Sequence, residues 1–164
     1  MKSLSKVPGY AMLLLLLFYF GSARAEPAAD FQLFDQAGNP ISLQDYRGKA
    51  LILHFWGTWC PFCHELQPKL DRLYRKYKNS GLEVLAISIR EQRAANPQQV
   101  LAELGVSFPT AVKGDNVAKM YGVPGTPTTF FINREAQILW KTHSAKASDS
   151  QLELQARRIL NLDK

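Results

Sequence analysis

The chain has 164 residues, of which 46% are hydrophobic and 21% charged, a composition that excludes a disordered or fibrous protein. Length and composition indicate one globular domain that can bury a core without disulfide staples. The formal net charge of +6 falls to +3 beyond residue 25, where 17 basic residues face 14 acidic ones, because Lys2, Lys6 and Arg24 precede that point without any acid. So modest a charge gives no support to nucleic-acid binding, and we expect no nucleic-acid partner.

Residues 1–25 are typical of a secretory signal peptide. Two lysines precede an apolar run at 10–20, and Ala23-Arg24-Ala25 offers small residues at both positions that a signal peptidase reads. We therefore predict an exported, periplasmic domain at 26–164. The run is shorter than the roughly 20 residues of a membrane span. An uncleaved N-terminal membrane anchor is the alternative, and only then would the protein contact a membrane.

The first half of the domain predicts a β-hairpin, a buried strand and a long helix. Hydrophobic residues alternate around a turn at 35–39, which indicates a hairpin over 30–43. The apolar run at 50–56, interrupted by His54, is typical of a central strand covered on both faces. After the cysteines, apolar residues at helical spacing predict a long helix that ends at 79–81: Leu66, Leu70, Leu73, Tyr74 and Tyr77.

The second half alternates strands with helices. Strands are predicted at 82–89, 108–112, 128–133 and 137–141, the last two as an antiparallel pair. Helices are predicted from Asn96-Pro97 to Gly105, at 115–121, and from a cap at Ser148 or Asp149. This order predicts an α/β sandwich, in which a central mixed sheet is flanked by helices and extended by the N-terminal β-hairpin.

The two cysteines of the chain, Cys60 and Cys63, lie three positions apart between the predicted buried strand and the long helix. A disulfide that closes so short a loop stabilises a fold by only about 2 kcal/mol in the chain-entropy relation, so the pair is a poor staple. At a helix start, backbone N–H groups and the helix dipole stabilise a Cys60 thiolate. Cys63 lies one turn on, where it can resolve a mixed disulfide. The spacing predicts thiol–disulfide exchange, in either direction.

Metal binding is the other chemistry open to two cysteines. A closed zinc site needs four ligands, and only His54, His64 and His143 are available to join the pair. A Cu(I) carrier that uses both cysteines and His143 is the binding-protein alternative, because soft thiolates suit that ion. Our prediction is an enzyme without a metal or other cofactor.

Two segments resemble the thioredoxin superfamily. They are the run Phe55-Trp56-Gly57-Thr58-Trp59-Cys60-Pro61-Phe62-Cys63 and the run from Gly122 to Ile132. With the hairpin they resemble the exported TlpA/ResA/DsbE group, over nearly all of residues 30–160. The resemblance implies a thioredoxin-like sandwich with a cis Pro127 beside the cysteines, and a Thr126 backbone that faces the substrate chain. Trp59 and Phe62 are expected to be exposed aromatic contacts for a partner.

The resemblance also implies a task. Members of this group reduce protein disulfides in an oxidising compartment, in cytochrome c maturation or thiol repair, and a membrane electron-donor thiol protein supplies them. The expected partners are therefore that donor and protein substrates with disulfides or dithiols. A DsbA-like dithiol oxidant is the main alternative. A peroxidase needs a threonine and an arginine beside its cysteine. Only Thr58 supports that alternative here.

Three features depart from the resemblance, and one of them is the dipeptide Pro61-Phe62 between the cysteines, which occurs in oxidants and reductants alike. His54 stands where thioredoxin has a buried acid, and it either relays a proton to Cys63 or is a core histidine. Leu66 stands where the group tends to carry a glutamate, and Glu65 is one residue early, a helical step of about 100° away. His64 is either an exposed helix residue or a cation that tunes the site. The direction of electron flow is therefore left open.

Overall fold

The computed structural model describes residues 25–163. The predicted signal peptide or anchor at 1–25 lies outside these residues, apart from Ala25. Within the described part of the chain, no helix is both long enough and apolar enough to cross a membrane.

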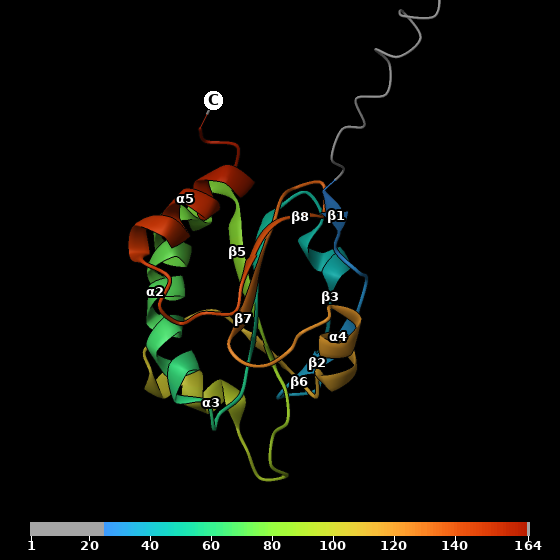
Figure 1. The fold of residues 1–164 in the computed structure, drawn as a ribbon. Coiled ribbons are helices and arrows are strands. Elements are labelled where there is room, and N and C mark those ends of the chain that lie inside the picture. Colours follow the sequence, from blue (N-terminus) through green and yellow to red (C-terminus); the bar gives the residue numbers. More distant parts are fainter. Residues whose placement is uncertain (1–24, 164) are drawn as a thin grey trace, which may run out of the picture.

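A mixed sheet forms the centre of the domain (Figure 1), and within residues 25–163 it has eight strands in the order β1-β8-β7-β4-β5-β6-β2-β3. Strands β4, β5 and β6 are parallel, and the other neighbours are antiparallel. The strands are β1 (Glu26–Pro27), β2 (Gln32–Asp35), β3 (Pro40–Ser42), β4 (Ala50–Trp56), β5 (Leu82–Ser88), β6 (Thr110–Val112), β7 (Thr128–Ile132) and β8 (Gln137–Thr142). The predicted fold class is confirmed.

Helices cover both faces of the sheet (Figure 1). One face carries α2 (Pro61–Tyr77), α3 (Pro97–Glu103) and α5 (Asp149–Ile159). The other carries α4 (Asp115–Met120) and the 3-10 helix η2 (Leu43–Tyr46). A second 3-10 helix, η3 (Lys78–Ser80), follows α2 and ends at Gly81, whose φ of 90° is left-handed and suits glycine.

The central strand β4 is buried along its whole length, and its side chains alternate between two cores. Ile52 and Trp56 pack in the same cluster as Cys60 and Cys63, beneath α2 and α5. Leu53 and Phe55 pack in the opposite cluster, against α4. Because successive side chains of a strand point to opposite faces, His54 lies on the face that carries the cysteines.

The ends of several elements differ from the sequence prediction. Strand β3 ends at Ser42 because the Asp45 carboxylate accepts a hydrogen bond from Ser42 N at 2.7 Å, which starts η2. Strand β6 begins at Thr110, two residues later than predicted, because Pro109 has no N–H for the ladder. Strand β1 was not predicted, because two residues carry no periodic signal.

Candidate active site

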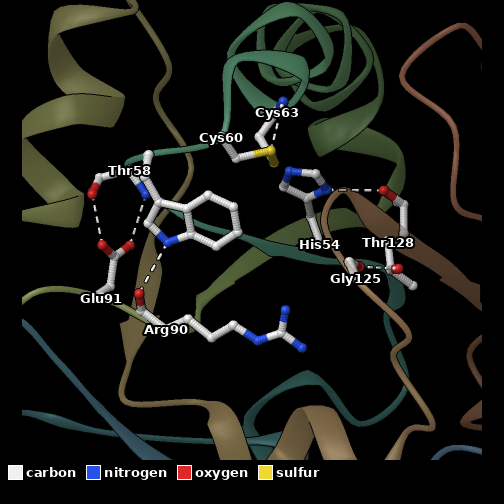
Figure 2. Close-up of a disulfide and its surroundings, with 10 residues drawn as sticks. His54, Thr58, Cys60, Cys63, Arg90, Glu91, Gly125 and Thr128 are labelled. Atoms are coloured by element: carbon white, nitrogen blue, oxygen red, sulfur yellow. Dashed lines mark hydrogen bonds between the residues drawn. A yellow bond between two sulfur atoms is a disulfide. The ribbon is translucent and has the colours of Figure 1, made fainter.

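The site centres on a disulfide between Cys60 and Cys63 at the start of α2 (Figure 2). Cys60 is the N-cap of the helix, and its sulfur accepts a hydrogen bond from Cys63 N at 3.2 Å. Pro61 occupies the first turn of the helix, where a backbone N–H has no acceptor within the helix, so its absence costs no hydrogen bond. Cys60 is 2% exposed and Cys63 is fully buried, so Cys60 is the sulfur that a partner can reach.

His54 lies below the disulfide on β4, and Figure 2 shows its ring directed toward the two sulfurs. Its Nδ1 is 2.9 Å from the Thr129 hydroxyl, whereas Nε2 has no hydrogen-bond partner within residues 25–163. The side chain is fully buried, and desolvation lowers the pKa of His54 to about 3. The ring is therefore neutral at physiological pH, with one nitrogen able to donate and the other able to accept.

A turn before β7 carries the peptide bond between Thr126 and Pro127, which is cis as the resemblance implied. Thr128 pairs with Phe55 of β4, so this turn lies at the end of the sheet from which the chain runs on to Cys60. Pro127 is buried, and the Thr126 hydroxyl oxygen is buried without a hydrogen-bond partner in the described residues.

A histidine after β8 holds this turn. The Thr128 hydroxyl donates to Gly125 O at 2.6 Å and lies 3.0 Å from Nδ1 of His143 (Figure 2 shows the first bond). The hydroxyl has a single proton, which goes to Gly125, so Nδ1 of His143 is the donor in the second bond. These two hydrogen bonds share the buried hydroxyl of Thr128, which links the residues before and after the cis bond.

Two aromatic side chains flank the disulfide on the surface, as predicted. Trp59 is 48% exposed and Phe62 is 56% exposed. Trp59 Nε1 donates to Arg90 O at 3.0 Å, which fixes the indole. Trp56, by contrast, is buried and donates from Nε1 to Thr110 Oγ1 at 3.1 Å.

Glu91 is a neighbour of the site that sequence reasoning missed. Its carboxylate accepts hydrogen bonds from both N and Oγ1 of Thr58, at 2.8 and 2.6 Å (Figure 2). No short motif joins Glu91 to the cysteines. Its place after β5 was a usable signal, because parallel strands β4 and β5 end at the same edge of the sheet.

The three residues after Cys63 point in different directions. His64 is half-buried, packs edge-on against Trp56 at a ring distance of 6.5 Å, and has a buried Nε2 without a partner in the described residues. Glu65 is exposed, and Leu66 is buried in the core. A tuning role for His64 or Glu65 stays a prediction.

No three His, Cys, Asp or Glu side chains of residues 25–163 gather closely enough to hold a metal ion. His143, the proposed third copper ligand, is instead bonded to Thr128. The Thr58 hydroxyl, which a peroxidase would need, is directed to Glu91. Thiol–disulfide exchange is the chemistry for which the site is arranged.

Comparison with known proteins agrees with this geometry. The family model described as AhpC/TSA family matches residues 25–141. Thiol-disulfide oxidoreductase ResA of Halalkalibacterium halodurans is 38% identical over 80% of this chain and 74% of that protein. ResA of Bacillus thuringiensis subsp. konkukian is 34% identical over 80% of this chain and 76% of that protein.

Solved structures show the same fold. A protein described as thiol:disulfide interchange protein DsbE of Chlorobium tepidum has a TM-score of 0.76 and 29% identity, over 84% of this chain and 97% of that chain. A secreted Mycobacterium tuberculosis disulfide oxidoreductase homologous to E. coli DsbE has a TM-score of 0.68 and 21% identity, over 78% and 95%, which supports the fold alone. The chain therefore belongs to the thioredoxin-like AhpC/TSA family, as a ResA/DsbE-type thiol-disulfide oxidoreductase whose redox-active pair is Cys60 and Cys63.

Proposed function

We propose that the protein is an exported reductant that reduces disulfides in protein substrates, with cytochrome c maturation or thiol repair as its task. Export rests on the signal-like segment at 1–25. Trp59 and Phe62 would contact the substrate, and the Thr126 backbone before Pro127 would pair with it as a short strand. A membrane thiol protein would supply the electrons.

The surroundings of Cys60 are the observation that favours reduction of the substrate over its oxidation. A strong oxidant owes its potential to a stabilised thiolate in its reduced form. Here the Cys60 sulfur accepts one backbone hydrogen bond, from Cys63, while Phe62 is apolar and His54 is uncharged. Within residues 25–163 no side-chain cation donates a hydrogen bond to this sulfur. The helix start alone stabilises the thiolate, which supports a reducing couple.

The exchange runs in two balanced steps. The Cys60 thiolate attacks one sulfur of the substrate disulfide, that bond breaks, and the other substrate sulfur leaves as a thiolate and takes up a proton. Cys63 then loses its proton and attacks Sγ of Cys60, which releases the first substrate sulfur and forms the Cys60–Cys63 disulfide. The substrate gains two electrons and two protons, and a dithiol donor must restore the pair.

His54 would relay the proton of the second step, which is supported by its ring facing the sulfurs and by an Nε2 without a partner within residues 25–163. An ordinary thiol pKa of about 8.5 lies far above the pKa of about 3 for His54, so complete proton transfer before the attack is strongly unfavourable. The proton can therefore leave Cys63 only as its sulfur attacks Cys60. The same low pKa prevents the ring from keeping the proton, which passes to the departing substrate thiolate.

The reduction potential tests the direction. Equilibration with a thiol–disulfide buffer should give a value near that of thioredoxin, about −270 mV, because little stabilises the Cys60 thiolate. A value near that of DsbA, about −120 mV, would overturn the reductant and support the dithiol oxidant.

Trapping tests the partners. The variant Cys63→Ser lacks the resolving thiol, so substrates should accumulate as mixed disulfides on Cys60. The complexes should come from the periplasmic fraction, with Glu26 as the first residue of the protein. The variant Cys60→Ser is the matched control and should capture nothing. An empty Cys63→Ser sample would count against exchange with proteins.

A further inference from the structure

The segment that leads into Cys60 is tied to the loop after β5. Glu91 accepts from Thr58 N and Oγ1 at 2.8 and 2.6 Å, and the carbonyl of Arg90 accepts from Trp59 Nε1 at 3.0 Å. The two loops are therefore joined by three hydrogen bonds immediately before the reactive cysteine (Figure 2). The bonds to Glu91 are charge-assisted, which makes them stronger than bonds between neutral groups.

The Trp59 indole is fixed although it is half exposed. A Cβ added to Gly57 would lie 2.5 Å from Trp59 Nε1 and 2.6 Å from Cε2, so the indole occupies the space that a side chain at Gly57 would need. One end of the indole rests against this backbone, and its N–H is held by Arg90. An exposed aromatic side chain that is already ordered loses little entropy when a partner binds it.

The loop after β5 is shaped for this contact. Arg90 has a φ of 54°, a left-handed conformation that is uncommon for a residue with a side chain, and its N donates to Asp115 Oδ1 at 3.1 Å. The following residue, Glu91, then faces Thr58. Residues in such conformations often belong to functional sites, where the surrounding structure holds them in place.

We propose that Glu91 is a positioning residue for substrate binding: by holding Thr58 to the loop after β5, whose Arg90 carbonyl accepts from Trp59, it keeps the Trp59 indole a preordered contact for the protein substrate beside Cys60. This inference rests on the proposed function and deepens it. Glu91 touches neither sulfur in the structure and acts through Thr58 and Trp59. Its effect is on the binding of protein substrates and leaves the exchange reaction itself unchanged.

The test distinguishes the hydrogen bonds of Glu91 to Thr58 from its negative charge. In Glu91→Gln, Oε1 can still accept from Thr58 N, and Nε2 can donate to the Thr58 hydroxyl, so the contact survives without the charge. Glu91→Ala removes both bonds. Kinetics are measured with an excess of a small dithiol that restores the reduced pair after each turnover, and with two probes, disulfide-bonded insulin and the small disulfide bis(2-hydroxyethyl) disulfide; the rate without the protein is subtracted. Glu103→Ala, which removes an exposed carboxylate bonded to Gln99, is the control for charge and handling.

We expect Glu91→Ala to raise KM for insulin by about two- to tenfold with kcat unchanged, which corresponds to the cost of ordering one side chain. The small disulfide, which has no use for the indole, should react at the wild-type rate. Glu91→Gln should stay near wild type. Trp59→Ala should raise KM as well, and adding Glu91→Ala to it should change nothing more, because the two residues act as one unit.

Several results would overturn the inference. One is an unchanged KM for insulin in Glu91→Ala. Another is an equal rise of KM in Glu91→Gln and Glu91→Ala, which would assign the effect to charge. The third is that the effects of Glu91→Ala and Trp59→Ala on KM add. If Glu91→Ala does not fold, Thr58→Val removes the shorter bond alone and should raise KM about twofold. Wild-type protein that reduces neither probe would refute the proposed function without bearing on Glu91.

Discussion

At the scale of single residues, His54 is the position with the strongest physical consequence. An unfolded histidine has a pKa near 6.5, whereas burial lowers the pKa of His54 to about 3 in the folded protein. The unfolded state therefore binds more protons than the folded state between these values. Stability is unaffected above about pH 6.5 and falls as the pH drops toward 3.

We therefore predict that the free energy of unfolding of the oxidised protein decreases by about 1 kcal/mol per pH unit below pH 6 through His54 alone. The variant His54→Gln has no titrating group there and should lose less stability between pH 6 and pH 4. Urea unfolding at several pH values measures both proteins. Equal slopes would show that the buried ring does not stay neutral in the folded protein.

At the scale of elements, the turn before β7 depends on a residue that follows β8. His143 donates to the Thr128 hydroxyl, which in turn donates to Gly125 O across the cis bond. The variant His143→Ala should leave the fold intact, since the side chain is exposed and one hydrogen bond contributes about 1 kcal/mol. A looser turn should raise KM for protein substrates a few-fold.

The asparagine variant is the matched control, because its amide N–H can take the place of Nδ1–H. His143→Asn should keep a KM near wild type, measured with insulin as above. If His143→Ala and His143→Asn behaved alike, the hydrogen bond to Thr128 would have no part in holding the turn.

The elements show which features a sequence can reveal. Strand β4 and helix α2 follow from a continuous apolar run and from regular spacing, and both lie where they were predicted. The cysteine pair follows from a local motif, whereas the cis Pro127 was expected only from the family resemblance. Glu91 and His143 could not be assigned in this way, because each acts on a residue that is distant in the sequence and near only after the sheet has formed.

At the scale of the whole molecule, the sheet order explains why these residues meet. Strand β4 lies between β5 and β7, so the loop after β4 leads to Cys60, the loop after β5 carries Glu91, and the turn before β7 carries Pro127. These three connections lie at the same end of the sheet, where β4 and β5 end and β7 begins. The disulfide packs in the core cluster beneath α2 and α5, and Figure 1 shows the start of α2 at this end of the sheet.

The central place of β4 also separates what can change from what cannot. His54 lies on a buried strand with ladder partners on both sides, where a substitution disturbs the packing beneath the disulfide. The proposed contacts Trp59 and Thr126 belong instead to connecting segments, which tolerate variation far better than strands do. Related chains can therefore differ in the protein substrates that they bind while they keep the same redox chemistry. Exchange of these loops could change the substrate specificity without changes to the core.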